Sequence, residues 1–554
     1  MNDTSTRDVV ICGGGLAGLC LARQLRLRNS DLEIVVLDKE SRPLPAAAHK
    51  VGESTVELGS HYLIEYLQLA EYLREAHLPK FGLRYFFGDS QAAFGQRLEF
   101  GPQQFPVVPS LQLDRGVLEN DLRERICQMG VELLEGSAVR DLDLRSGDEP
   151  HEIIFVREGK TRTLRARFVV DATGRRRLIQ QRLGLSKSVE HPISAAWWRV
   201  DGLRKVGDLM GSAGRRPWDT GLQDKRWLST NHVMGPGYWV WLIPLSSGHT
   251  SVGIVADERL HSLSSYNSHD KAQRWLAEHE PALARFLSDA APLDFRALKN
   301  FSYWSEQVFD RRWACVGEAG VFADPFYSPG TDYIGLSNTL ACQLVEADRD
   351  GTSTPEFVAQ SNRSILTDLG RNTLLYYLDN YRMFGSTKVM VAKIHWDTCY
   401  YWGFPCQLFF QRCTMPEQLA EFGPIAQRFA VLNEAVQALF RSWAERAHDD
   451  ETPQGRFVAY SSMPFFLDLL RDLERRKTPQ ATFADMRRNL ERMEAWAHAL
   501  HREAVNDGLP EHPALLPLST RPDSAPKESM PEQQHPASSS AFELTQADIA
   551  DMAS

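Results

Sequence analysis

The sequence lacks the features that mark membrane-spanning and secreted proteins. In 554 residues no apolar run reaches about 18 residues, the length that a helix needs to cross a bilayer. The chain also opens without the basic segment and apolar stretch of a secretory signal peptide, and its first apolar strand begins by residue 8. We therefore expect a soluble cytoplasmic protein that is not inserted in a membrane.

Cysteine and positive charge are both scarce. Eight cysteines in 554 residues are too few for a disulfide framework. None lies in a C-x2-C pair or beside clustered histidines, so we expect small buried hydrophobes and no bound metal. Lys and Arg total 62 against 72 Asp and Glu, a net charge of −10. Duplex binding depends on basic side chains that neutralise phosphates, so we exclude nucleic acid as a partner.

The start of the chain has the pattern of a dinucleotide-binding unit. Residues 9–38 contain an apolar strand, a glycine turn, a helical stretch and a second strand ending in an acid. Gly13, Gly15 and Gly18 form G-x-G-x-x-G, in which the glycines make the tight turn, admit a pyrophosphate and let helix pack on strand, respectively. Asp38 stands where a carboxylate binds a ribose hydroxyl group. The pattern predicts a doubly wound, Rossmann-like α/β domain.

Two later segments indicate which dinucleotide binds. Residues 168–174 (FVVDATG) predict a buried strand running into a turn, and residues 312–324 (RWACVGEAGVFAD) predict a strand that ends at Gly317 and Glu318. With the first unit they resemble the FAD enzymes built like aromatic hydroxylases. That resemblance implies FAD as the cofactor and a flavin ribityl or ribose contact for Gly317 and Glu318. The family usually has Asp where this chain has Glu318, and the longer carboxylate can make the same hydrogen bond.

The remaining pattern predicts an interleaved sheet followed by helices. Residues 80–87 predict a strand, and helical apolar spacing covers 56–76 and 113–129. Further segments have strand-like β-branched or aromatic content, namely 152–157, 163–171, 194–201, 238–245 and 250–256. We predict an FAD-binding domain over 1–340, interleaved with an antiparallel substrate-domain sheet at about 80–112 and 190–300. A C-terminal helical cap over 341–508 and a disordered tail over 509–554, rich in Pro, Ser, Gln and charge, complete the expected organisation.

A sharper resemblance lies in residues 237–245, GYWVWLIPL. Trp239, Trp241, Ile243 and Pro244 reproduce W-x-W-x-I-P, the signature associated with flavin-dependent halogenases, and the chain resembles that family over roughly residues 7–500. Taken alone, the segment is equally a core strand with two tryptophans on one face, because a strand repeats every second residue.

The segment HKVGEST at residues 49–55 matches the family's V-G-E-[AS]-T, which passes beside the flavin ring. Gly52 lets the backbone approach a cofactor closely, and Ser54 can hydrogen-bond it. Lys50 lies beside this segment, and Arg115 lies near the start of a helix that returns to the nucleotide domain. We assign all four residues to cofactor binding.

The segment LPKFGLRYFF matches the family strand that carries an essential lysine, which is Lys80 here. An ammonium group can hydrogen-bond and polarise hypohalous acid, or an amine can be converted to a haloamine, so either form can deliver electrophilic halogen to an aromatic ring. A purely structural lysine at a strand start would be solvated. The resemblance implies the catalytic role.

Residues 324–338, DPFYSPGTDYIGLSN, correspond to the family's loop that holds halide and begins a helix, whose N–H groups suit an anion. Family members place Ser or Thr before the glycine and use its N–H, whereas Pro329 has none. A halide site here would rest on Gly330, Thr331 and the hydroxyl groups of Ser328 or Thr331. Tryptophan-type members have Glu where this chain has Tyr327, so the resemblance is closer to members that act on phenols or carrier-tethered rings. Asp332 has no assignable counterpart.

Three functions fit these motifs. In a halogenase, reduced FAD and oxygen form a flavin hydroperoxide, halide is oxidised to hypohalous acid, and Lys80 directs it to an electron-rich ring. In an FAD-dependent monooxygenase, the oxygen itself goes to the substrate and Pro329 reflects a lost halide site. In a flavin-storing or partner-binding protein no turnover occurs, which the Trp pair and Lys80 disfavour.

The expected partners follow from the same motifs. The substrate is a small aromatic molecule, free or carrier-bound. Because only one G-x-G-x-x-G unit occurs, a separate NAD(P)H-dependent flavin reductase is the natural source of reduced FAD. The sequence leaves the substrate's identity, the site of halogenation and the choice between chloride and bromide open.

Overall fold

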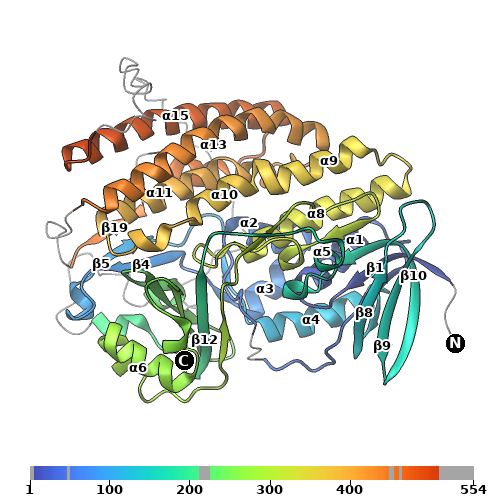
Figure 1. The fold of residues 1–554 in the computed structure, drawn as a ribbon, viewed down its shortest axis with the longest axis horizontal. Coiled ribbons are helices and arrows are strands. Elements are labelled where there is room, and N and C mark those ends of the chain that lie inside the picture. Colours follow the sequence, from blue (N-terminus) through green and yellow to red (C-terminus); the bar gives the residue numbers. More distant parts are fainter. Residues whose placement is uncertain (1–4, 47–49, 211–224, 448–454, 461–464, 511–554) are drawn as a thin grey trace.

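The structure is a computed structural model that describes residues 5–46, 50–210, 225–447, 455–460 and 465–510. Residues 511–554 of the tail predicted over 509–554 lie outside the described residues, and the tail's first residue, Leu509, is buried. Figure 1 shows two sheets side by side, with a layer of long helices running across both. No helix of the described part is long and apolar enough to cross a membrane.

The first sheet carries the nucleotide-binding unit. β1 (Thr6–Cys12) runs into α1 (Leu16–Arg28) and then β2 (Ile34–Leu37), as predicted. β1 pairs in parallel with β2 and with β10 (Lys160–Asp171). The strand order is β7-β2-β1-β10-β9-β8, with β18 also pairing with β10. The remaining strands are β7 (Glu132–Leu134), β8 (Ser137–Asp143), β9 (His151–Arg157) and β18 (Trp313–Cys315).

Helices cover this parallel region, so its strands are apolar on both faces. Val9, Val10 and Ile11 of β1 are fully buried. The helices packed around it include α4 (Arg115–Gln128) and α8 (Gly330–Arg349), both of which contact or flank α1. A short helix, α5 (Leu178–Leu183), follows β10.

The second sheet has the order β16-β12-β15-β14-β13-β4-β5-β19. Neighbours pair antiparallel except β13 with β4 and β19 with β5, which are parallel. The strands are β4 (Leu83–Phe87), β5 (Leu98–Gly101), β12 (Ile193–Asp201), β13 (Thr230–Gly235), β14 (Tyr238–Pro244), β15 (His249–Asp257), β16 (Arg296–Leu298) and β19 (Phe457–Ala459). The chain thus enters and leaves this sheet several times, and its last strand comes from the mainly helical C-terminal part.

Smaller elements connect the two sheets. Two further strand pairs join β3 (Leu78–Pro79) to β6 (Leu111–Gln112) and β11 (Ser186–Ser188) to β17 (Tyr303–Ser305). The outer face of the second sheet carries α6 (His269–His279) and α7 (Pro281–Phe286). Short 3-10 turns lie at Phe94–Gln96, Gly174–Arg176, Val206–Met210, Arg226–Leu228, Leu263–Ser265 and Gly317–Ala319.

The C-terminal helices form the layer across the top of Figure 1. They are α9 (Pro355–Arg363), α10 (Gly370–Tyr377), α11 (Thr387–Gly403), α12 (Pro405–Phe410), α13 (Pro416–Ala444), α14 (Phe466–Asp472) and α15 (Pro479–Asn506). A π-helical turn at Ser364–Asp368 and a 3-10 turn at Asn380–Met383 interrupt the α-helices of the cap that the sequence predicts over 341–508.

Two predicted elements near the site are wrong in detail. The strand expected over 80–87 begins at Leu83, because Gly82 adopts a left-handed φ of 72° that ends any extended run from Lys80. Lys80 therefore lies in the connection between β3 and β4. The helix expected over 56–76 is three pieces, α2 (Glu57–His61), a π-helical turn at Tyr62–Tyr66 and α3 (Ala70–Ala76), with Gln68 at a left-handed φ of 54° between the last two.

Candidate active site

The glycine turn after β1 has the geometry that a dinucleotide requires. A Cβ added to Gly13, whose φ is 118°, would lie 2.3 Å from the Ala172 carbonyl oxygen, and one added to Gly18 would lie 2.0 Å from that of Gly13. The nearest atom to a Cβ on Gly15 is the Lys50 Nζ at 4.0 Å. Two glycines thus permit close backbone packing, and Gly15 opens onto space at the N-terminus of α1, where a pyrophosphate fits.

Asp38 lies beside this turn, at the end of β2. Its carboxylate forms a buried ion pair with Arg123 of α4, which also donates to the Gly14 carbonyl oxygen at 3.0 Å. A Cβ on Gly14 would lie 2.7 Å from Asp38 Oδ2. The acid is therefore where the sequence places it, and its contact with a ribose stays a prediction.

The segment before α2 passes over the start of α4. Arg115 donates to the Val51 carbonyl oxygen at 2.8 Å and to Glu119 Oε1 at 2.6 Å. Lys50 forms an ion pair with the same Glu119, and the two cations hold the pKa of that buried carboxyl group below its usual range against the effect of burial. Gly52 has a φ of 95°. Lys50 and Arg115 thus lie together beside the glycine turn.

A narrow cleft brings together residues of the predicted flavin segment, the tryptophan motif and the predicted halide loop. Its lining comes from the 51–54 segment, β14, the Gly317–Ala319 turn and the loop before α8. The predicted residues on it are Gly52, Ser54, Trp239, Trp241, Ile243, Glu318, Ser328 and Gly330. Pro244 ends β14 outside the lining, and Gly317 packs between Ala17 and Ile334. Burial raises the pKa of Glu318, and Arg175 and Arg115 oppose that rise.

The two tryptophans share one face of β14, and polar groups behind the cleft fix them. Trp241 lies opposite Gly253 of β15, where a Cβ would fall 2.2 Å from the indole. Trp239 Nε1 donates to the Tyr381 hydroxyl group at 2.9 Å, which in turn donates to Asp324 at 3.0 Å. Asp324 begins the segment predicted as the halide loop, but no sequence pattern pairs it with Tyr381, which lies in the 3-10 turn Asn380–Met383.

The loop before α8 presents fewer groups to the cleft than predicted. Ser328 has a left-handed φ of 59° and its hydroxyl group lies 3.2 Å from that of Ser54. α8 starts at Gly330, with Pro329 as the N-cap residue, so the first N–H groups of the helix, including those of Gly330 and Thr331, have no partner within the helix. The Thr331 side chain packs against Gly59, where an added Cβ would lie 2.8 Å from it.

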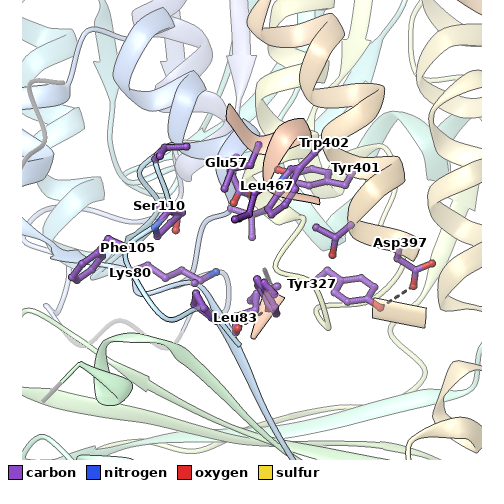
Figure 2. Close-up of a pocket in the computed structure, with 18 of the residues that line it drawn as sticks. Glu57, Lys80, Leu83, Phe105, Ser110, Tyr327, Asp397, Tyr401, Trp402 and Leu467 are labelled. Carbon is purple, nitrogen blue, oxygen red and sulfur yellow. Dashed lines mark hydrogen bonds between the residues drawn. The ribbon is translucent and has the colours of Figure 1, made fainter. Parts of the chain in front are cut away.

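A second cavity, of about 320 Å³, adjoins the cleft. Pro329 lines both spaces and separates them. Figure 2 shows Lys80 reaching into this cavity from the β3–β4 connection. The aromatic or apolar part of the wall includes Val56, Leu83, Phe105, Tyr376, Tyr401, Trp402, Tyr460 and Leu467.

Lys80 is only 1% exposed, and its Nζ donates to the carbonyl oxygen of Thr55 at 2.7 Å. Thr55 directly follows Ser54 of the cleft, so the lysine connects the cavity to the segment predicted to lie beside the flavin. The pKa of Lys80 is lowered to about 7 because burial outweighs the opposing effect of the Glu57 and Asp332 carboxyl groups. The sequence finds Lys80 by resemblance, and it does not find these two neighbours.

The far wall of the cavity holds a polar cluster that sequence reasoning missed. The Tyr327 hydroxyl group donates to Asp397 Oδ2 at 2.8 Å, as Figure 2 shows. The same oxygen accepts from Lys393 Nζ at 2.6 Å, and Oδ1 accepts from Gln437 at 2.8 Å. Lys393 and Asp397 are spaced i, i+4 on α11. Any helical ion pair can have this spacing, so it does not single out the cluster in the sequence.

Comparison with known proteins agrees with this geometry. A family model described as an FAD binding domain matches residues 6–210. The flavin-dependent halogenase chlA of Dictyostelium discoideum is 27% identical over 71% of this chain and 69% of its own length. A 1H-pyrrole-2-carbonyl-[peptidyl-carrier protein] brominase of Pseudoalteromonas luteoviolacea is 24% identical over 68% of this chain and 87% of its own length.

The fold is also that of solved halogenases. Halogenase PltM in complex with phloroglucinol and FAD superimposes with a TM-score of 0.62 at 17% identity, covering 90% of this chain and 96% of that one. CmlS, a flavin-dependent halogenase, gives 0.55 at 20% identity, covering 78% and 79%. The glycine turn, the FAD-binding match and these relatives show a chain that takes FAD as its cofactor and is similar to flavin-dependent halogenases.

Proposed function

We propose that the protein halogenates an electron-rich aromatic small molecule and that Lys80 directs the halogen to it. The observation that carries this proposal is the position of Lys80, buried in the second cavity yet hydrogen-bonded to Thr55 of the segment that lines the cleft. FAD, when bound and reduced, supplies the oxidation of halide by oxygen to hypohalous acid. That species is small enough to pass Pro329, which borders both spaces.

Residues of the chain would then control the halogen. The first N–H groups of α8 are free to bind an anion such as halide at the helix N-terminus. The Ser328 hydroxyl group adds a further donor on the cleft. The Lys80 amine hydrogen-bonds the hypohalous acid and directs it toward a ring held between the aromatic walls. A ring held beside Lys80 by these walls would meet hypohalous acid before the acid diffuses away.

A small ring fits the cavity. Its volume, about 320 Å³, lies at the lower end of small-molecule sites. Relatives include an enzyme named for a carrier-bound pyrrole and a structure with phloroglucinol bound, so both a carrier-tethered ring and a free phenol belong to the proposal. A separate NAD(P)H-dependent flavin reductase would supply reduced FAD, because the described part of the chain has one glycine-rich nucleotide unit.

The test uses product analysis by mass spectrometry with reduced FAD, oxygen and a panel of phenols and pyrroles. Wild type should give a halogenated product only with bromide or chloride. Lys80→Ala should abolish that product while FAD stays bound, and Lys80→Arg should also fail because a guanidinium group differs in geometry and does not readily form a haloamine. Lys187→Ala, a lysine with a 57% exposed side chain, is the matched control.

The competing function, monooxygenation, predicts a different result. An oxygenated product that forms without halide would replace the halogenase proposal. Halogenation that persists in Lys80→Ala would support the halogenase function but show that Lys80 is not needed for it. Unchanged FAD binding in the two Lys80 variants, measured by flavin fluorescence, separates a chemical effect from a loss of cofactor.

A further inference from the structure

Lys80 shares its cavity with two buried carboxyl groups from different helices. Glu57 opens α2 and Asp332 lies in the first turn of α8, and the two residues are 8% and 6% exposed. Both line the cavity with Lys80, and Figure 2 shows Glu57 on the wall across from the lysine. Among the described residues, no carboxylate oxygen lies within ion-pair distance of Nζ, and the three side chains line one cavity.

Asp332 is held rigidly in this position. Its Oδ1 accepts from the Gly59 N–H at 2.7 Å, and the neighbouring Leu58 N–H donates to the Tyr401 hydroxyl group at 2.9 Å. Asp332 therefore also caps the first turn of α2. An amide at the same position keeps that acceptor oxygen and loses only the charge, so capping and charge can be tested apart.

We propose that Glu57, Asp332 and Lys80 share protons as one unit during halogen transfer, with a carboxylate as the base for the ring proton. The inference rests on the proposed function. In the family's tryptophan-type members a glutamate stands where this chain has Tyr327, and in this chain the carboxyl groups that face the lysine come instead from α2 and α8.

The electrostatics of the cavity agree with this arrangement. Burial raises the pKa of Asp332 to about 8 and also raises that of Glu57, while it lowers that of Lys80 to about 7. The negative carboxylates and the positive ammonium group stabilise one another's charged forms. Removing either acid should therefore lower the Lys80 pKa further. The protons belong to the set of three groups.

Other titratable or charged groups surround the unit. Those that line the cavity or approach it from neighbouring elements are His232 on β13, Tyr327 before α8, Asp397 and Tyr401 on α11, Cys406 on α12, Tyr460 after β19, Arg84 on β4 and Arg471 on α14. Burial keeps His232 neutral near pH 7, with a pKa of about 3. Lys393 pairs with Asp397, and Glu99 pairs with both Arg84 and Arg226. Glu57 and Asp332 are thus the acids whose charges act on Lys80.

Proton sharing meets a need of the reaction. Hypohalous acid and an aromatic C–H give the C–halogen bond and water, so the O–halogen bond breaks with its electron pair on oxygen. The Lys80 ammonium group donates the proton that turns this hydroxide into water. A carboxylate takes the proton that leaves the ring carbon and returns it to the Lys80 amine, which restores the starting state with atoms and charges balanced.

The first experiment measures the Lys80 amine directly. FAD-loaded protein is treated with a trace of acetic anhydride from pH 5 to 10, and mass spectrometry of the digest reports acetylation of Lys80. Only the neutral amine reacts, so the midpoint follows its pKa. Asp332→Asn and Glu57→Gln should each move the midpoint down by about one pH unit. Lys187 in the same digest is the internal control, and Asp368→Asn removes a buried carboxyl group outside the cavity and should leave the midpoint of Lys80 in place.

The second experiment follows halogenation against pH in the same proteins. The alkaline limb, where Lys80 loses its proton, should move down in Asp332→Asn and Glu57→Gln and stay fixed in Asp368→Asn. Unmoved midpoints and an unmoved limb in both acid variants would overturn the inference. A wild type that shows no halogenation at any pH would instead refute the proposed function, whatever the acetylation midpoints show.

Discussion

The Ser328 hydroxyl group donates to the Ser54 hydroxyl group at 3.2 Å, and Ser54 is in turn 2.7 Å from Thr230 Oγ1. This contact joins the loop before α8 to the segment that leads into α2, although 274 residues separate them in the chain. Both serines line the cleft together with Pro329, which also borders the cavity of Lys80. The positions of the predicted halide loop, the predicted flavin segment and Lys80 are therefore linked through neighbouring contacts.

Pro329→Ser should strengthen halide binding. The substitution restores an N–H next to Gly330, and Pro329 has a φ of −79° that serine adopts without strain. A hydrogen bond to an anion contributes about 1.5–3 kcal/mol, so we expect the KM for bromide to fall about tenfold with kcat nearly unchanged. Steady-state kinetics at varied bromide gives the answer. Pro325→Ser, in the same loop, is the control, and equal KM values in wild type and Pro329→Ser would show that halide does not use this position.

Gly15→Val should abolish FAD binding and leave the fold intact. Its Cβ points into open space near Lys50, where the pyrophosphate would lie, so the branched side chain excludes the ligand and strains little else. Gly18→Val is the contrast, because its Cβ would lie 2.0 Å from the Gly13 carbonyl oxygen and should lower the melting temperature. Fluorescence titration and thermal unfolding report the two effects. Wild-type FAD affinity in Gly15→Val would contradict the assignment of this turn.

The sequence predicts the nucleotide unit because each feature there is local. Strand, glycine turn and helix are consecutive, and the burial of Val9 to Ile11 follows from their unbroken apolarity. The same holds for β14, where the spacing of Trp239 and Trp241 fixes a shared face. The family resemblance adds Lys80, but local sequence patterns do not predict which residues surround it.

What the sequence misses depends on contacts between distant elements. α11 has buried residues on all sides, so it has no amphipathic pattern by which to recognise it. Cys399 and Cys406 are buried as predicted, but they lie on two helices that part at Phe404. Asp332 and Glu57 meet only because α8 packs against α2, and no spacing within either segment signals that contact.

Tyr327→Phe should weaken substrate binding without changing halide use. The Tyr327 hydroxyl group donates to Asp397 and keeps its own oxygen free to accept from a substrate at the cavity wall. Without it the ring remains and Asp397 keeps Lys393 and Gln437 as donors, so the fold should survive. We expect the KM of the aromatic substrate to rise about five- to tenfold, the value of one hydrogen bond.

Tyr377→Phe is the matched control for that change. Its ring lies beside Tyr327, at 5.8 Å between centroids, and its buried hydroxyl oxygen has no hydrogen-bond partner in the part of the chain that the structure describes. It also lies outside the lining of the cavity. Equal KM values for the aromatic substrate in all three proteins would show that Tyr327 does not contact the substrate.

Asp332→Asn should stabilise the protein at alkaline pH. Burial raises the pKa of Asp332 from its ordinary value of 3.8 to about 8, so between these values the folded state holds a proton that the unfolded state has lost. The wild type therefore loses stability as pH rises through that window, and the loss is complete above pH 8. The amide does not titrate, yet its oxygen still accepts from Gly59.

Thermal unfolding at pH 5 and pH 9 should show the variant gaining on the wild type by about 2 °C or more at the higher pH. Asp350→Asn, an exposed acid at the end of α8, should show no such gain. A difference between variant and wild type that is the same at both pH values would mean that Asp332 is ionised throughout, and that its carboxylate is already paired in the folded protein.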